Sequence, residues 1–375
     1  MITPGLRNVH VTYWRSLQAH GNTSLTNMLI TYGGGKAWNF SHSLGRPTGE
    51  HNGTTGGFMN PVSIAVADEN NLFVLNRGWG TLLIQDRAHD AGCRIGKMTI
   101  DEYHFGDFAR GEFVWPVGLA ISADGNLYVS DEADHKIAWL PPDRIVPFPE
   151  NIPTGERLGE WGALGCAEGQ INAPAGIEFD QHDDLYVVDS GNNRVQKFTK
   201  HGDFLMTWGT AGTGNGEFDH PWGITIDHQG FIYVADWGNN RIQKFTPSGE
   251  FVMCIGDGYE LDHPADVAVD SEGDVYVADW GNKRVQIFES DGNLLASLSG
   301  DASEFSKAQE YVITRDNAKQ SFAMNTNHPA VTNMGRFGRV TGVEVTTDDR
   351  IIATDSRGRL QVYDKNKQFV LIPPP

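Results

Sequence analysis

One phrase of thirteen residues recurs along this chain, and it constrains the fold more than any other feature. The copies "YVADWGNNRIQKF" and "YVADWGNKRVQIF" begin 43 residues apart, at Tyr233 and Tyr276. Four further copies, of increasing divergence, begin at Tyr186, Tyr128, Phe73 and Ile352. A phrase that recurs at this spacing is typical of a solenoid or a propeller, and not of a series of independent domains.

Each repeat unit reads as a series of short β-strands. Between residues 221 and 256, the stretches "GITID", "FIYVAD", "RIQKF" and "FVMCIG" are apolar or alternate between apolar and polar side chains. Turn-forming Gly, Asn, Asp and Ser separate these stretches. Four strands repeated in this way form a propeller blade, which cannot bury both of its faces alone. We therefore predict an all-β fold, a six-bladed β-propeller of four-stranded antiparallel blades around a central channel.

A second phrase comes before each copy of the first, as in "PAGIEFDQHDD" and "PWGITIDHQGF". It begins at Pro61, Pro116, Pro174, Pro221 and Pro264, and the sixth copy begins with Val340 instead. Together, the patterns "F-x-x-P-x-G-I" and "YVAD-x-G-N-x-R-I-Q-x-F" resemble the NHL repeat over residues 58–363. The known folds of that family are six-bladed propellers, so the resemblance implies this fold. It implies little about function, because one scaffold can carry unrelated activities.

The repeats predict a single domain. We expect an N-terminal segment at residues 1–57, blades one to five at 58–300, an insertion at 301–337, and blade six at 338–375. A strand from one terminus that pairs with the last blade would close the ring and remove an exposed edge. The stretch "NMLITYGGG" (residues 27–35) resembles a fourth strand, while the C-terminal "FVLIPPP" competes for the same place. In the insertion, "DASEFSKAQEY" predicts a short helix, and insertions of this length are typical of lids or interaction loops.

Three blades carry the same polar set in the turn after their second strand. The set consists of Asp189, Asn192 and Arg194; Asp236, Asn239 and Arg241; and Asp279, Asn282 and Arg284. One reaction needs only one set of catalytic groups, whereas Asp and Asn close turns and Arg can bind a carboxylate or carbonyl of the next blade. We interpret these residues as structural ties within and between blades.

The charge balance narrows the range of partners. The chain has 29 Lys and Arg against 48 Asp and Glu, a net charge of −19. It has no basic stripe to neutralise phosphates, so we expect binding neither to nucleic acid nor to an anionic membrane.

Three cysteines are too few for a disulfide framework, no apolar run reaches membrane-spanning length, and the N-terminal residues lack the pattern of a secretion signal. We expect a cytoplasmic protein whose partner is a small-molecule ligand or another protein.

Aromatic and imidazole side chains gather on one face of the predicted ring. In a propeller, the linker into each inner strand lies on the same face as the turn between the second and third strands. The position before the proline holds Asn60, Trp115, Ala173, His220 and His263. The tryptophans fill gaps between blades in one interpretation, and they line a recessed ligand site in the other. In the second interpretation, the ligand-binding residues are Asn60, Trp79, Trp115, Trp222, Trp237 and Trp280.

The histidines on this face raise the question of a metal. His220 and His263 each follow an aspartate, and His328 in "NHPAV" lies on the insertion. Three histidines around an open position would form a catalytic zinc site, and the alternative divalent metal is calcium. However, acidic turns such as "DSEGD" suit tight turns better than calcium ligation. In the opposing interpretation "DHP" is a harmless variant of the repeat phrase, because no motif such as HExxH supports a metal.

A distant similarity to the peptidylglycine-amidating lyases, which are zinc-dependent propellers, adds one residue. The stretch "FVLNRGWG" is similar to a phrase in their first blade, and this similarity makes Arg77 a candidate substrate-facing cation. That family places its zinc histidines between the proline and the glycine of the Pro-x-Gly phrase. At those positions this chain has Val62, Val117, Ala175, Trp222 and Ala265. The zinc ligands are missing, so the similarity does not extend to that reaction.

Two functions remain open from the sequence. The first is a small-molecule-binding propeller, as a metal-assisted hydrolase or lyase with candidate catalytic residues His220, His263 and Arg77. The clustered aromatic residues and the long insertion favour it. The second is a non-catalytic protein-interaction scaffold of the NHL type, which the lack of a recognisable catalytic set favours.

Overall fold

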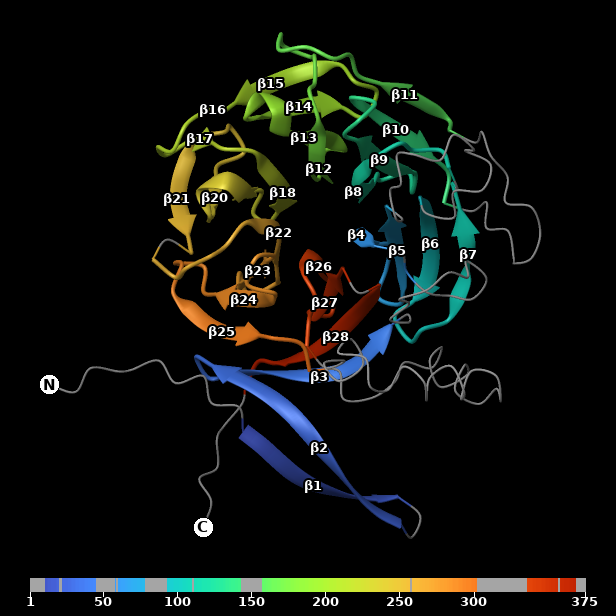
Figure 1. The fold of residues 1–375 in the computed structure, drawn as a ribbon, viewed down its shortest axis with the longest axis vertical. Helices are drawn as coiled ribbons and strands as arrows, with labels where there is room; N and C mark the ends of the chain where they lie inside the picture. The colour runs from blue at the N-terminus through green and yellow to red at the C-terminus, as the bar shows by residue number, and fades with distance from the viewer. Residues whose placement is uncertain are drawn as a thin grey trace, which may run out of the picture.

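The computed structural model describes residues 11–19, 22–44, 58, 60–77, 93–109, 111–142, 157–256, 258–301, 336–356 and 358–368. Six antiparallel sheets lie in a ring around a central channel, with the first strand of each blade innermost (Figure 1). The predicted six-bladed all-β propeller is therefore confirmed. The described residues contain no α-helix, and so no helix long and apolar enough to cross a membrane.

Blades one to five each run as a four-stranded meander. Blade one consists of β4 (Pro61–Val66), β5 (Asn71–Asn76), β6 (Arg94–Thr99) and β7 (His104–Phe108). Blade two consists of β8 (Pro116–Ile121), β9 (Leu127–Asp131), β10 (Lys136–Leu140) and β11 (Gly159–Trp161). Blade three consists of β12 (Pro174–Phe179), β13 (Asp184–Asp189), β14 (Arg194–Thr199) and β15 (Phe204–Trp208).

The next two blades are the most regular. Blade four consists of β18 (Pro221–Ile226), β19 (Ile232–Asp236), β20 (Arg241–Phe245) and β21 (Phe251–Ile255). Blade five consists of β22 (Pro264–Val269), β23 (Val275–Asp279), β24 (Arg284–Phe288) and β25 (Leu294–Leu298). The linker between blades three and four holds a short parallel pair, β16 (Thr210–Ala211) and β17 (Glu217–Phe218). Two 3-10 turns, η2 (Ser190–Asn192) and η3 (Trp237–Asn239), follow the second strands of blades three and four.

Blade six is assembled from both ends of the chain. Its inner strands are β26 (Val340–Val345), β27 (Arg350–Asp355) and β28 (Arg359–Asn366), and its fourth strand is β3 (Lys36–Leu44). A hairpin of β1 (Val11–Ala19) and β2 (Asn22–Gly33) continues the sheet outside the ring (Figure 1).

An N-terminal strand thus pairs with the last blade, but it is not the predicted one. Residues 27–33 lie in β2, one strand further out, and the competing C-terminal residues 369–375 fall outside the described part. The side chains of β3 explain the choice, because Ala37, Trp38 and Leu44 are fully buried. The indole of Trp38 also donates a hydrogen bond of 3.1 Å to the hydroxyl of Tyr276 in blade five.

Apolar side chains fill the interfaces between neighbouring blades. One buried cluster joins Tyr128 and Ile137 of blade two to Ile177 and Leu185 of blade three, and similar clusters join the next pairs of blades. Phenylalanines at or next to the ends of the third strands are fully buried at Phe198, Phe245 and Phe288. Each buried side chain of this size contributes roughly 1.5–3 kcal/mol to stability. The blades therefore hold one another, as expected for a repeat that cannot bury both faces alone.

The repeated Asp, Asn and Arg form a buried network, which confirms their structural role. In blade four, the fully buried carboxylate of Asp236 accepts hydrogen bonds from the side chains of Asn239, Arg241 and Gln243. Arg241 also donates to the carbonyls of Gly214 and Glu217, at 2.6 and 2.9 Å. Those carbonyls belong to the linker that arrives from blade three. The arginine therefore holds the incoming linker, and not the following blade as the sequence suggested.

The predicted insertion can be followed only at its edges. Residues 302–335 lie outside the described part of the chain, so the predicted short helix and His328 are not placed. Phe337 is buried, and its backbone N–H donates to the carbonyl of Ser299 at 3.0 Å. The end of the insertion is therefore fixed where blade five meets blade six.

Candidate functional site

Four of the six residues that precede the inner strands share one backbone conformation. Asn60, Ala173, His220 and His263 have φ values of 53°, 50°, 49° and 54°, in the left-handed region. In this conformation the backbone N–H of His220 reaches the side-chain oxygen of Asn193, at 2.7 Å. The N–H of His263 reaches Asn240 in the same way, at 2.8 Å. A polar side chain in the turn of one blade therefore fixes the residue that precedes the inner strand of the next blade. We call the residues at this position and in the adjacent turns the mouth of the channel.

Four of the mouth residues stack in series across blades four to six. The imidazole of His263 lies 4.1 Å from the ring of Trp237 and 6.4 Å from that of Trp280, measured between centroids. The guanidinium carbon of Arg339 lies 3.9 Å above the ring of Trp280. Arg339 is exposed, and the two tryptophans and His263 are partly exposed. We call this set, Trp237, His263, Trp280 and Arg339, the aromatic arc.

Both mouth histidines are oriented by the aspartate before them. The Nδ1 atom of His220 lies 2.6 Å from a carboxylate oxygen of Asp219, and that of His263 lies 2.5 Å from Asp262. A carboxylate at Nδ1 favours a proton on that nitrogen and leaves Nε2 as the acceptor. The side chain of His220 is 66% exposed, so its Nε2 is open to solvent. Such a nitrogen can accept a proton or bind a metal ion.

A second group lies across the mouth, between blades one and two. The guanidinium of Arg77 lies 4.7 Å above the ring of Trp115, and its Nε donates to the carbonyl of Pro116 at 3.0 Å. Burial lowers the pKa of Arg77 to about 10. Glu132 follows the second strand of blade two, and burial raises its pKa above the ordinary range. We call Arg77, Trp115 and Glu132 the charged arc.

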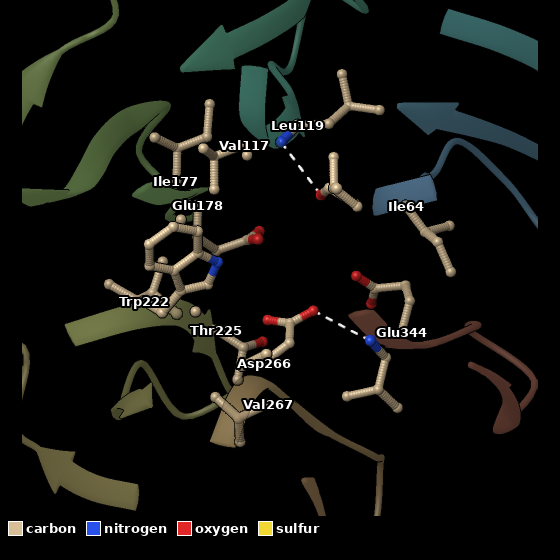
Figure 2. A pocket seen from close by; sticks show the side chains of 18 of the residues that line it. Ile64, Val117, Leu119, Ile177, Glu178, Trp222, Thr225, Asp266, Val267 and Glu344 are labelled. Atoms are coloured by element: carbon tan, nitrogen blue, oxygen red, sulfur yellow. Dashed lines mark hydrogen bonds between the residues drawn. The ribbon is translucent and has the colours of Figure 1, made fainter. Parts of the chain in front are cut away.

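The channel beneath the mouth contains a cavity with an empty volume of about 460 Å³, part of which is open to solvent. The inner strands of all six blades line it, and Trp222 faces it from blade four (Figure 2). Ser63 and Asp266 accept hydrogen bonds from the backbone N–H groups of Leu119 and Val343 in the next blades, at 3.2 and 3.1 Å. These bonds link neighbouring inner strands.

Three carboxyl groups point into this channel, from Glu178, Asp266 and Glu344 (Figure 2). Burial is the main cause that raises their pKa values, and repulsion from the neighbouring carboxyl groups adds to it for Glu178 and Glu344. The pKa of Asp266 rises to about 7 and that of Glu344 to about 8, while that of Glu178 rises well above the ordinary range. The channel therefore holds three carboxyl groups whose pKa values all lie above the ordinary range.

The comparisons with known proteins agree with this geometry. The NHL repeat family matches residues 172–198, 218–245 and 261–288, in blades three, four and five. These matches lie within the six-bladed ring. The chain is a six-bladed β-propeller that contains NHL repeats.

The relatives of this NHL-repeat propeller say little about its activity. The B-box type zinc finger protein ncl-1 of Caenorhabditis elegans is 31% identical over 91 residues, which is 24% of this chain and 10% of that protein. A Bacteroides thetaiotaomicron protein of unknown function has a similar structure, with a TM-score of 0.57, 16% identity and coverage of 92% and 80%. Virginiamycin B lyase of Staphylococcus aureus, solved with quinupristin, gives a TM-score of 0.52, 14% identity and coverage of 88% and 99%. At these identities the structural matches show the fold alone.

The NHL-repeat propeller brings several predicted site residues together. His263 contacts Trp237 and Trp280, and Arg77 contacts Trp115. Trp222 lies deeper, in the channel, and Asn60 accepts the backbone N–H of Arg77 at 3.1 Å. His220 lies one blade before the aromatic arc, paired with Asp219. Trp79 and His328 fall outside the described residues.

Several residues of the site were not predicted from the sequence. Among them are Arg339, Glu132 and the three channel carboxyl groups. Arg339 occupies the same repeat position as His263, and Glu132 the same position as Trp280, so alignment of the six repeats could have found both. The residues in the described ranges contain no group of three or more His, Cys, Asp or Glu that could hold a metal ion.

Proposed function

We propose that this propeller binds a small planar aromatic acid at the mouth of its channel. The observation that carries the proposal is the aromatic arc, in which two tryptophans and an imidazole leave ring surface exposed. Within the described residues, the exposed guanidinium of Arg339 has a ring contact and no ion pair. An aromatic ring stacks on tryptophan, and a carboxylate pairs with arginine. One molecule that carries both groups would satisfy both parts of the arc.

The oriented histidines suit proton transfer to or from a bound molecule. A carboxylate at Nδ1 orients the ring and leaves Nε2 as the acceptor, and a positioned imidazole is the commonest general base in proteins. The reactions that such a group supports include proton abstraction in a lyase and water activation in a hydrolase. Arg77 supplies a cation on the opposite side of the mouth for the developing negative charge.

A metal is not required for this proposal. His220 and His263 supply two imidazoles, whereas catalytic zinc needs three protein ligands, and the third candidate, His328, lies outside the described residues. The described residues therefore fit a zinc ion only in part. Calorimetric titration with zinc chloride tests the metal separately, since His220→Ala should abolish zinc binding if this imidazole is a ligand.

The experiment for the aromatic acid is a titration with 2-naphthoate, followed by tryptophan fluorescence. Trp280→Ala removes a stacking surface and the support for Arg339, so we expect affinity to fall at least about tenfold, or about 1.4 kcal/mol. Trp161→Phe, in the outer strand of blade two, is the matched control and should leave the affinity unchanged. Equal affinity in the wild-type and Trp280→Ala proteins, or no saturable quenching, would overturn the proposal.

A second candidate function is an interaction scaffold, and one observation favours it. Strand β1 is the edge of a six-stranded sheet and lies outside the ring (Figure 1). Its free backbone groups suit the addition of a strand from a partner protein. Removal of residues 1–33 should then abolish partner binding and leave 2-naphthoate binding intact. Loss of both together would contradict a separate scaffold role.

A further inference from the structure

Arg77 and Glu132 occupy equivalent positions in neighbouring blades. Each directly follows the second strand of its blade, β5 for Arg77 and β9 for Glu132. The same position holds Ser190, Trp237, Trp280 and Ser356 in the other blades. The repeat therefore does not require a charged side chain at this place. Two opposite charges side by side in the ring need an explanation other than the fold.

The turn network of blade two does not use Glu132. Asp131, the residue before it, accepts backbone hydrogen bonds from Val114, Trp115, Ala133 and Asp134, and so closes the turn by itself. One carboxylate oxygen of Glu132, Oε2, is buried and has no hydrogen-bond partner within the described residues. A buried carboxylate oxygen without a donor costs free energy in the folded state. This cost is the first sign that a donor binds here.

Arg77 and Glu132 are both anchored at the start of β8, to two adjacent residues. The Nε of Arg77 donates to the carbonyl of Pro116, and the backbone N–H of Glu132 donates to the carbonyl of Trp115, each at 3.0 Å. The two side chains therefore start from neighbouring points of one strand end. Each lies close enough to shift the pKa of the other. Even so, they form no ion pair within 4.0 Å in the described structure.

The guanidinium of Arg77 is only partly used. Its Nε is bonded and its face lies over Trp115, while its two terminal amino groups have no hydrogen bond or ion pair to any described residue. Burial lowers its pKa, and the nearby Glu132 and Asp131 offset only part of this effect. A half-buried cation and a half-buried carboxylate thus lie at the ends of neighbouring strands with hydrogen-bonding capacity that the described residues do not use.

We propose that Arg77, Trp115 and Glu132 form a subsite for an α-amino acid in its zwitterionic form. The carboxylate of the ligand pairs with the terminal amino groups of Arg77, and its ammonium pairs with the orphaned oxygen of Glu132. The ligand has no net charge, so both protein charges are compensated at once without adding charge to the mouth. This subsite uses different residues from the aromatic arc, and it does not rest on the binding of an aromatic acid.

The test compares three probes that differ in one charge each. Isothermal titration calorimetry on the full chain uses L-phenylalanine, N-acetyl-L-phenylalanine, which lacks the ammonium, and L-phenylalaninamide, which lacks the carboxylate. We expect the wild-type protein to bind phenylalanine at least about tenfold more tightly than either derivative. Equal affinities for the three probes, or no heat from phenylalanine at millimolar concentration, would overturn the proposal without the need for any variant.

Two variants then assign the contacts. Arg77→Gln should weaken phenylalanine at least about tenfold and leave phenylalaninamide nearly unchanged. Glu132→Gln should weaken phenylalanine to a similar degree and leave N-acetylphenylalanine unchanged or slightly tighter. The control is Arg350→Gln, since this arginine of blade six pairs with Asp348 and belongs to neither arc. An equal loss in Arg350→Gln, or a loss without this crossed pattern, would show that Arg77 and Glu132 do not bind the two ends of the ligand.

Discussion

Two kinds of aspartate lie on the same face of this propeller, and they have different roles. Asp236 and Asp279 end the second strands of blades four and five and are fully buried. Asp219 and Asp262 precede the mouth histidines, and their side chains are 50% and 47% exposed. The buried pair accepts hydrogen bonds from several donors of the repeat, whereas the exposed pair holds one imidazole each. We call the buried aspartates and their donors the frame of the propeller. Burial and the number of hydrogen-bond donors distinguish these aspartates from those of the candidate site.

The two kinds are joined by direct contacts. The backbone N–H of Asp219 donates to the carboxylate of Asp236 at 2.8 Å, and Asp262 donates to Asp279 in the same way. A Cβ atom at Gly238 would lie 2.5 Å from a carboxylate oxygen of Asp219, so the glycine of the "WGN" turn leaves room for this side chain. The buried frame therefore sets the position of each Asp–His pair, and changes in the two parts should have different effects.

The largest expected effect comes from the buried frame. Asp236→Ala removes the acceptor for Asn239, Arg241 and Gln243, which leaves Gln243 buried without this partner. Loss of one partner from a buried charged network costs about 3–5 kcal/mol. Chemical denaturation should show a loss of this size. A loss below about 1 kcal/mol would mean that the network is not the main tie of the blade.

Arg241→Ala should have the next largest effect. It removes the donor to the carbonyls of Gly214 and Glu217, and with it the hold on the incoming linker. We expect unfolding to require about 1–3 kcal/mol less free energy. The affinity for 2-naphthoate should not change, because Arg241 has no contact with the aromatic arc. Normal stability together with lost ligand binding would move Arg241 from the frame to the site.

The channel carboxyl groups predict a pH dependence of opposite sign to that of an ordinary ion pair. The pKa of Glu344 is about 8 in the folded protein, above the usual value near 4.3 in the unfolded chain. Between these values the folded state holds a proton that the unfolded state releases, so stability falls as pH rises from about 4 to 8. Glu344→Gln removes this term. Because the channel is partly open to solvent, the charge is screened and the pH effect on stability is reduced. We expect a gain on the order of 1–2 kcal/mol at pH 9 and none at pH 4. Equal pH profiles for the two proteins would contradict the raised pKa.

The fold could be predicted because six copies of one phrase leave a single arrangement that buries every face. The ring-closing strand could not be assigned correctly, since residues 27–35 resemble a fourth strand as well as β3 does. A tertiary contact decides which strand closes the ring. Trp38 of β3 reaches Tyr276 in blade five, a contact between residues 238 positions apart that no local pattern contains.

The site could be predicted in part for a related reason. Equivalent repeat positions place His263 and the turn tryptophans on one face, and their contacts follow from ring closure. The channel carboxyl groups were missed because Glu178 and Glu344 look like ordinary polar residues of alternating strands. They face the channel only in the closed ring, where the inner strands approach so closely that a Cβ at Gly176 would lie 2.7 Å from the carbonyl of Trp222.

The smallest effect on stability should come from the mouth histidines. His220→Ala combined with His263→Ala removes two side chains that are 66% and 37% exposed, so little buried surface is lost. Their backbone N–H groups, which bind Asn193 and Asn240, remain in place. Loss of the imidazoles should lower stability by less than about 1 kcal/mol, within the range of surface substitutions. Binding of 2-naphthoate should weaken, because the ring between Trp237 and Trp280 is gone, and any proton-transfer activity should disappear. If the double variant instead unfolds as readily as Asp236→Ala, the histidines belong to the frame, and the distinction between the two kinds of aspartate fails.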